Sequence, residues 1–251
     1  MENVDTQQTL ELRCAAAWPA VTVDKIGDWQ LRAADGFTGR ANSALAVGDP
    51  GMPVEHALRA VCDFAHDHAI APVVQAVVGG AAERAIEAAG WVPHTGHAAG
   101  HLVSVLTGPL GAGGEDISVL AAPTAAWWEL TIGRSDPTDA QRHVLTTGQV
   151  GYPVAYVMGI TAGAVRAAVV DDVLHISRLA VRPEYRRRGL ASALMAACGP
   201  WAAERGATRT VLQVAVDNRD ALALYEGLGF TEHHRYRYWV PGPRACEDRS
   251  L

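Results

Sequence analysis

One stretch, residues 175–199, constrains the fold more than any other part of the chain: HISRLAVRPEYRRRGLASALMAACG. Its apolar start predicts a strand, and Pro183 ends that strand because proline gives no N–H group to a β ladder. Apolar residues at helical spacing after Gly189 predict a helix. Free backbone N–H groups would then face outward at the positive end of a helix dipole. We therefore predict a binding site for a phosphate or pyrophosphate group at this loop.

The charge of this loop limits the kind of anion. Residues 178–188 contain five arginines and one glutamate, whereas the 251-residue chain has a net charge of -6. Nucleic-acid-binding proteins spread basic residues over a face and place aromatic residues among them. A single basic spot favours a small polyanion instead, so we expect no nucleic-acid partner. Neither a Walker loop nor a dinucleotide-binding G-x-G-x-x-G motif is present.

Composition and short motifs predict the general class of protein. With 49% hydrophobic and 19% charged residues, the sequence is typical of a globular protein. The first residues, MENVDTQQTLELR, form no signal peptide, and the apolar runs are shorter than the ~18 residues of a membrane span. We expect a cytoplasmic protein without a membrane partner. The four cysteines and ten histidines lack metal-ligand spacing, which predicts free thiols and no metal site.

Glycine and proline indicate where the chain divides. The segment TGPLGAGGED, residues 107–116, has four glycines and one proline and predicts a linker at 111–116 between domains 1–110 and 117–251. Strands and helices that alternate after it predict a mixed α/β sheet. Residues 72–94 repeat the pattern of residues 210–233, a V-x-Q strand, a short helix and a Gly-aromatic pair. A duplication explains this best.

The first copy lacks the basic loop. Asp49, Pro50 and Pro53 stand where successive N–H donors and positive charge are needed, and prolines supply no N–H group. We therefore predict that only the second half binds the polyanion.

Two motifs together resemble a known family. RLAVRPEYRRRGLASALM (178–195) and NRDALALYEGLGF (218–230) resemble the acetyl-CoA loop and the distal motif of the GCN5-related N-acetyltransferases (GNAT). The resemblance covers about residues 117–240. The whole chain resembles actinobacterial tandem members of this family, in which a degenerate N-terminal copy precedes an active C-terminal one. It implies an α/β fold of two GNAT-like halves with acetyl-CoA as the cosubstrate.

The resemblance also implies roles for individual residues. The loop amides hold the CoA pyrophosphate, and the main chain of the preceding strand pairs with the pantetheine arm. The implied acetyl-CoA-binding residues are Leu179, Ala180, Val181, Arg186, Arg187, Arg188, Gly189, Leu190, Ala191, Ser192, Asn218, Ala221 and Tyr225.

Three residues are candidates for catalytic roles, two from the resemblance and one from a departure from it. The Leu179 amide polarises the thioester carbonyl and stabilises the oxyanion, and Tyr225 protonates the leaving thiolate. An alkyl amine with a pKa of about 10.4 has to lose a proton before it attacks. Many relatives have Glu where this sequence has His175 and Gln213, so His175 is the candidate base. The alternatives are a water chain or an acceptor of low pKa, a Tyr225 that only packs, and an Asn218 that only caps its helix.

The acceptor is less well defined. The family builds its acceptor pocket from the helices after the first strand, here around Trp127, Trp128 and Glu129, a set that favours a cationic amine unless the tryptophans are core. The segment 36–44 either lines this cleft or is a plain loop. A small amine, an antibiotic, an amino acid or a protein N-terminus would each fit the sequence as the acceptor. The sequence is also compatible with either a monomer or a homodimer.

The sequence thus predicts an acetyl-CoA-dependent N-acetyltransferase that acts by direct attack through a tetrahedral intermediate on a small molecule or a peptide. The alternative is a non-catalytic acyl-CoA sensor or interaction module built on the same fold.

Overall fold

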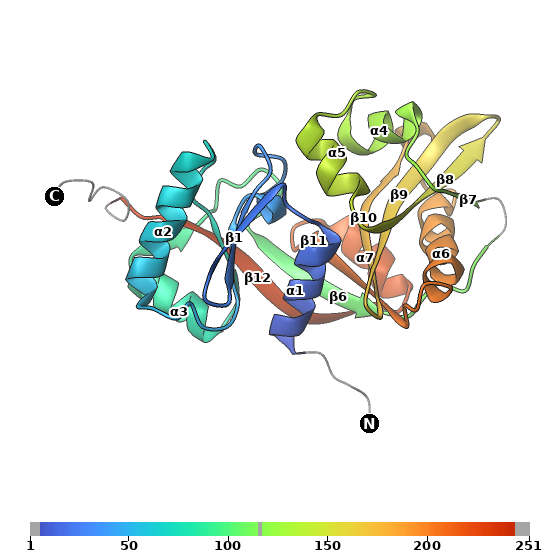
Figure 1. Ribbon diagram of the computed structural model, residues 1–251. Coiled ribbons are helices and arrows are strands. Elements are labelled where there is room, and N and C mark those ends of the chain that lie inside the picture. The colour runs from blue at the N-terminus through green and yellow to red at the C-terminus, as the bar shows by residue number, and fades with distance from the viewer. Residues whose placement is uncertain (1–5, 115–116, 244–251) are drawn as a thin grey trace. The chain divides into compact units, whose positions relative to one another are not determined.

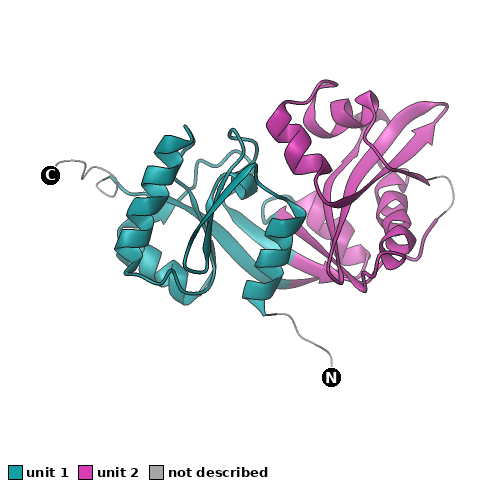
Figure 2. Cartoon of the chain, viewed as in Figure 1, with its two compact units in different colours: residues 1–105, 215–218, 233–251 teal, residues 106–214, 219–232 magenta. Residues whose placement is uncertain are grey.

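The computed structural model describes residues 6–114 and 117–243, which form two compact units (Figure 2). Unit 1 is Met1–Val105, Ala215–Asn218 and His233–Leu251; unit 2 is Leu106–Val214 and Arg219–Glu232. Most of the last described strand, from His233 onward, therefore belongs to unit 1. The division into domains 1–110 and 117–251, joined by the linker 111–116, concerns which segments fold independently. It stays a prediction.

Unit 1 is a sheet with helices on both faces. Its elements are α1 (Gln7–Ala17), β1 (Thr22–Ile26), β2 (Trp29–Ala33), η1 (Gly39–Ala41), β3 (Ala44–Ala46), α2 (Val54–Asp67), β4 (Val74–Val77), α3 (Ala81–Ala88), β5 (Trp91–Pro93), the start of β6 (Leu102–Gly108) and most of β12 (Thr231–Pro241). The strands β1, β2 and β3 are antiparallel, β3 and β4 are parallel, and β12 pairs antiparallel with both β4 and β5. Helices α2 and α3 pack with Trp29, Trp91 and Trp239 in one core, while α1 packs on Leu45.

Unit 2 is also a mixed sheet between helices. Its elements are the end of β6, β7 (Ile117–Leu120), α4 (Ala125–Ile132), α5 (Asp139–Thr146), β8 (Gln149–Val157), β9 (Ile160–Val170), β10 (Val173–Val181), η2 (Pro183–Tyr185), α6 (Leu190–Ala203), β11 (Arg209–Ala215) up to Val214, and α7 (Arg219–Gly227). The strands β7 to β10 form an antiparallel meander, and β11 is parallel to β10. Helices α6 and α7 lie on one side of this sheet, and α4 and α5 lie on the other (Figure 1).

Both units contain a parallel strand pair that is joined by a helix and followed by a second helix. In unit 1 these elements are β3, α2, β4 and α3; in unit 2 they are β10, α6, β11 and α7. The predicted mixed α/β architecture with two similar halves is therefore confirmed.

The glycines of the predicted linker serve close packing in the part that the structure describes, 111–114. The amide of Gly113 donates to the carbonyl oxygen of Ala196 at 3.0 Å. A Cβ on Gly111 would meet the backbone of Ala196, and a Cβ on Gly199 would meet the backbone of Gly111. The segment is thus fixed against α6, and its glycines allow two backbones to touch.

Two cysteines have the state that the sequence predicts and one does not. Cys14 and Cys198 are free and buried, and burial raises the pKa of the Cys198 thiol to about 12. Cys62 is disulfide-bonded, so the expectation of a free thiol is wrong there, and Cys246 lies outside the described residues. Among the residues with described positions, no helix is long and apolar enough to cross a membrane, and no group of three or more His, Cys, Asp or Glu could hold a metal ion.

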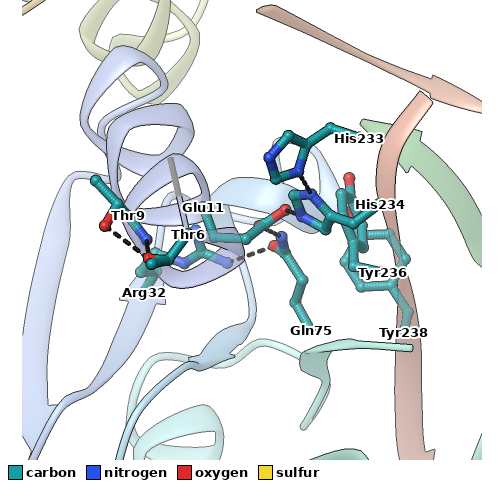
Figure 3. Close-up of polar contacts among 9 residues, drawn as sticks. All are labelled: Thr6, Thr9, Glu11, Arg32, Gln75, His233, His234, Tyr236 and Tyr238. Atoms are coloured by element: carbon teal, nitrogen blue, oxygen red, sulfur yellow. Dashed lines mark hydrogen bonds and ion pairs between the residues drawn. The ribbon is translucent and has the colours of Figure 1, made fainter. Parts of the chain in front are cut away.

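A buried polar network fixes α1 in unit 1. The Glu11 carboxylate accepts hydrogen bonds from His234 Nε2 at 2.8 Å and from Gln75 Nε2 at 2.5 Å, and the guanidinium of Arg32 donates to Gln75 Oε1 at 2.8 Å (Figure 3). All four residues are buried, and burial lowers the pKa of Arg32. Gln75 links the negative charge of Glu11 to the positive charge of Arg32. The two opposite charges lower the free-energy cost of burying each other in the core.

We expect Glu11→Gln to destabilise unit 1 by about 3–5 kcal/mol, because it leaves the Arg32 guanidinium buried without its counter-charge. Urea unfolding measures this effect. Glu87→Gln, at an exposed glutamate of the same unit, is the matched control and should change stability by less than about 0.5 kcal/mol. Equal stability of the two variants would contradict the charge balance.

Candidate active site

The strands β10 and β11 separate in the middle of the sheet of unit 2. They pair in parallel from Val173↔Arg209 to Ile176↔Leu212, where the pairing ends. On its other edge β10 stays paired with β9 as far as Val181, across a register shift between Ser177 and Ala180. Arg178 in this shift has φ 56°, which identifies a β-bulge. A fork therefore opens between β10 and β11.

The fork exposes backbone polar groups of the residues that the sequence singled out. Leu179, Ala180 and Val181 lie beyond the last β11 pair. Ala180 directs its backbone groups at β9, whereas Leu179 and Val181 direct theirs into the fork, where the Val181 carbonyl oxygen accepts from Arg186 Nε at 3.2 Å. The N–H groups of Leu179 and Val181 are therefore offered to a ligand. An extended chain can bind such an edge as an added strand. The bulge also has a signal in the sequence. The large apolar residues Leu174 and Ile176 stand at even positions, whereas Leu179 and Val181 stand at odd positions.

A basic loop follows directly on β10. The Arg182 amide donates to the Ala162 carbonyl oxygen at 2.9 Å, and the Tyr185 amide closes a turn onto the carbonyl oxygen of Arg182 at 2.9 Å. Arg186, Arg187 and Arg188 come next and are exposed to solvent. Arg186 Nε donates to the Val181 carbonyl oxygen at 3.2 Å, and the outer N–H groups of the three exposed guanidinium groups are available to an anion.

Gly189 starts α6 in a left-handed conformation, with φ 77° and ψ -2° and no side-chain cap on the helix. The first N–H groups of a helix have no partner within it, so those of α6 point outward at the end of its dipole. Apart from the adjoining backbone, no atom of the described residues lies within 4 Å of the position that a Cβ on Gly189 would take. An uncapped helix start, open space and three exposed arginines together fit a pyrophosphate group.

The corresponding loop of unit 1 already uses its amides. The Asp49 amide donates to Asp28 Oδ2 at 2.8 Å, and the Gly51 amide donates to Asp49 Oδ1 at 2.8 Å. Helix α2 then starts after Pro53 with a glutamate in its first turn. Carboxylates and prolines thus occupy the place where unit 2 has arginines and a glycine.

Tyr225 lies on α7 with its ring in the core of unit 2. It is 8% exposed and packs against Phe230, with 5.9 Å between the ring centroids. Burial raises the pKa of its hydroxyl to about 12, so the group keeps its proton at neutral pH. None of the residues with described positions makes a hydrogen bond to this hydroxyl. Tyr225 is therefore a packed aromatic that could also donate a proton.

The other predicted ligands divide between the two units. Leu179, Val181, Leu190 and Ala221 are partly buried against the same core cluster as Tyr225. Asn218 belongs to unit 1 and directly precedes α7. Its backbone N–H donates to the Ala215 carbonyl oxygen at 3.0 Å.

The candidate base is far less accessible than the sequence suggested. His175 is 1% exposed and lies in the paired part of β10, opposite Ala168 and Val211. At His175 both edges of β10 are still paired, so this residue lies below the fork and not at its opening. The base role of His175 stays a prediction, and its burial weighs against it.

The tryptophans of the expected acceptor pocket form core packing instead. Trp127 is 0% exposed and Trp128 is 4% exposed, and the Trp127 indole donates to the carbonyl oxygen of Val165 at 3.1 Å. Glu129 is exposed and lies 3.8 Å from the guanidinium of Arg182, at the end of β10. Of these three residues, only Glu129 is placed to meet a ligand.

Solved structures define the class of fold. A GCN5-related N-acetyltransferase from Kribbella flavida superposes with a TM-score of 0.70 at 14% identity, over 95% of this chain and 97% of that one. A tandem GNAT protein from the clavulanic acid biosynthesis pathway superposes with a TM-score of 0.58 at 15% identity, over 92% of this chain and 86% of that one. The chain has the GNAT fold in its tandem form.

Residues 6–239 match the family model described as "Probable histone acetyltransferase Rv0428c C-terminal", and the chain belongs to this family. Among curated proteins it is 42% identical over 72 residues to N-alpha-acetyltransferase 30 of Schizosaccharomyces pombe, which is 28% of this chain and 48% of that protein. It is 35% identical over 92 residues to the [Ribosomal protein bS18]-alanine N-acetyltransferase of Escherichia coli, which is 37% of this chain and 62% of that protein. The matches thus span about half to three fifths of these relatives.

Proposed function

We propose that the protein is an N-acetyltransferase that uses unit 2 to transfer the acetyl group of acetyl-CoA to a primary amine. The observation that carries this proposal is the fork between β10 and β11, which leads directly into the arginine loop and the uncapped start of α6. Together these elements offer a strand edge for the extended thioester arm and an anion site at the end of that edge.

The cytoplasmic location stays a prediction, and the choice between a monomer and a homodimer stays open.

In this proposal the chain binds acetyl-CoA mainly through its backbone. The amides of residues 187–192 and the three exposed arginines hold the pyrophosphate. The pantetheine arm lies along Leu179, Ala180 and Val181 as an added strand. Asn218 and Ala221 are the further contacts that the family resemblance implies.

The reaction is a direct displacement. The amine nitrogen attacks the carbonyl carbon of the thioester, and the Leu179 amide stabilises the oxyanion that forms. The C–S bond then breaks, and CoA leaves as a thiolate that takes a proton from Tyr225. The amine loses one proton to water or to a base, and Tyr225 regains a proton from water, so that the products are an amide and CoA thiol and the enzyme is restored.

We further propose that the acceptor is the α-amino group of a peptide. Both curated relatives are named for α-amino or alanine N-acetylation. An α-amine with a pKa of 7.7–8.0 is neutral in roughly one molecule in ten at pH 7, whereas a lysine amine is neutral in roughly one in two thousand. An α-amine therefore needs little help from a base, which suits a site whose candidate base is buried.

Binding measurements test the cofactor site. We expect isothermal titration to give one acetyl-CoA per chain, because the loop before α6 has an uncapped helix start and exposed arginines, whereas the corresponding loop before α2 already uses its amides. Acetyl-CoA and CoA should raise the melting temperature more than dephospho-CoA or a short DNA duplex. A stoichiometry near two would refute the single site, and equal stabilisation by DNA would refute an acetyl-CoA site.

The alternative function is an acyl-CoA sensor on the same fold. It predicts the same binding but no release of CoA thiol with any amine. The buried His175 favours this alternative, whereas the presence of Asn218 and Tyr225 at the positions of the family motif favours the enzyme.

A further inference from the structure

Ser177 carries a buried hydroxyl group that the fold does not use. The residue is 7% exposed, and its Oγ makes no hydrogen bond with any residue in the described part of the chain. An unsatisfied buried polar group of this kind destabilises a protein, and in native structures it calls for a specific explanation. Alanine would fill the same place without an unsatisfied oxygen.

The position of Ser177 suggests that explanation. It is the first residue of β10 after the last pair with β11, Ile176↔Leu212, and it precedes the bulge. Leu179, whose amide is the proposed oxyanion donor, follows two residues later. Ser177 therefore stands where the fork opens, beside the proposed place of the thioester carbonyl.

The direction of the side chain follows from the strand alternation. Leu174 and Ile176 face the core cluster that α6 and α7 cover. Ser177 points to the opposite face, where its cross-strand partner Arg166 donates to the Leu145 carbonyl oxygen near the end of α5. The hydroxyl thus lies on the face of the sheet opposite α6 and α7, the two helices that flank the proposed CoA site. An amine that meets the thioester on the side away from α6 and α7 arrives on the face that carries Ser177.

We propose that Ser177 positions the acceptor amine for attack, an inference that rests on the proposed acetyltransferase function. Its Oγ accepts a hydrogen bond from an N–H of the amine, which aims the nitrogen lone pair at the carbonyl carbon. The bond strengthens as the nitrogen gains positive charge in the transition state. The serine hydroxyl takes no proton itself, and the amine proton leaves to water. The hydroxyl is unsatisfied in the fold because its partner is the substrate.

The test compares Ser177→Ala with Ser118→Ala, a control at an exposed serine of β7 in the same sheet. Melting temperature, acetyl-CoA affinity by titration and CoA thiol release are measured for both variants and the wild type. The amines are an unblocked alanyl peptide, an N-acetylated peptide with one lysine, and kanamycin. We expect Ser177→Ala to melt a few degrees higher, to bind acetyl-CoA normally and to lose at least about tenfold in kcat/KM for the amine. Ser118→Ala should match the wild type in all three measurements.

Two results would overturn the role of Ser177 alone. One is a kcat/KM of Ser177→Ala within threefold of the wild type; the other is a lower melting temperature, which would show that the fold itself uses the hydroxyl. If the wild type releases no thiol with any of the three amines, the proposed acetyltransferase function fails and this inference fails with it.

Discussion

Replacing Tyr225 with Phe is expected to lower turnover by about 10²–10⁴-fold, the usual contribution of a positioned acid. The change keeps the ring and its packing against Phe230 but removes the hydroxyl, whose pKa of about 12 keeps it protonated. Because this hydroxyl bonds to no described residue, acetyl-CoA affinity and melting temperature should hardly change. Measurement of kcat and melting temperature for the variant checks both parts of the prediction.

Tyr225→Ala is the companion variant. It removes the ring from the core of unit 2 and should destabilise the fold by about 3–5 kcal/mol, as large core truncations do. A residue that only packs would give near-normal turnover in the Phe variant and a loss of stability in the Ala variant alone. Turnover of Tyr225→Phe within about threefold of the wild type would rule out the acid role.

Gly189→Val is expected to abolish measurable acetyl-CoA binding while the fold persists. Gly189 has φ 77°, a conformation that a β-branched residue adopts only with strain of about 1–3 kcal/mol. The new side chain would also fill the open space beside the loop amides. We expect the melting-temperature rise with acetyl-CoA to vanish and the affinity to fall by more than about 100-fold, some 2.7 kcal/mol.

Gly133→Val provides the matched control. Gly133 ends α4 in the same unit with φ 79°, and beyond its adjoining backbone no described atom lies within 4 Å of a Cβ placed there. Both variants therefore carry the same backbone strain, and only Gly189→Val alters the proposed anion site. If both bind acetyl-CoA as the wild type does, the loop is not the pyrophosphate site; if both fail to bind, strain alone explains the loss.

The sequence predicted those features that depend on neighbouring residues. The strand, basic loop and helix around Gly189 follow from local patterns, and the structure places them at β10, η2 and α6. The mixed sheet and the two similar halves follow from the order of such patterns. The uncapped start of α6 is also local, because the sequence after Pro183 offers no Ser, Thr, Asp or Asn at the helix boundary.

Features that depend on distant residues could not be predicted. Glu11 and His234 form a buried pair across 223 positions, and nothing local in either segment indicates the other. The burial of His175 and of the tryptophan pair depends in the same way on which helix covers which face of the sheet. For the same reason the sequence could not show that β12, at the end of the second half, completes the sheet of unit 1.

Thiol release with matched peptides tests the central claim most directly. One peptide has a free alanyl α-amine and no lysine, and the other has an acetylated N-terminus and one lysine. Mass spectrometry then locates the acetyl group. The account predicts release of CoA thiol with the first peptide, one acetyl group on its α-nitrogen, and far slower reaction of the second. Tight binding of acetyl-CoA without thiol release from either peptide would contradict the enzymatic account and support the sensor.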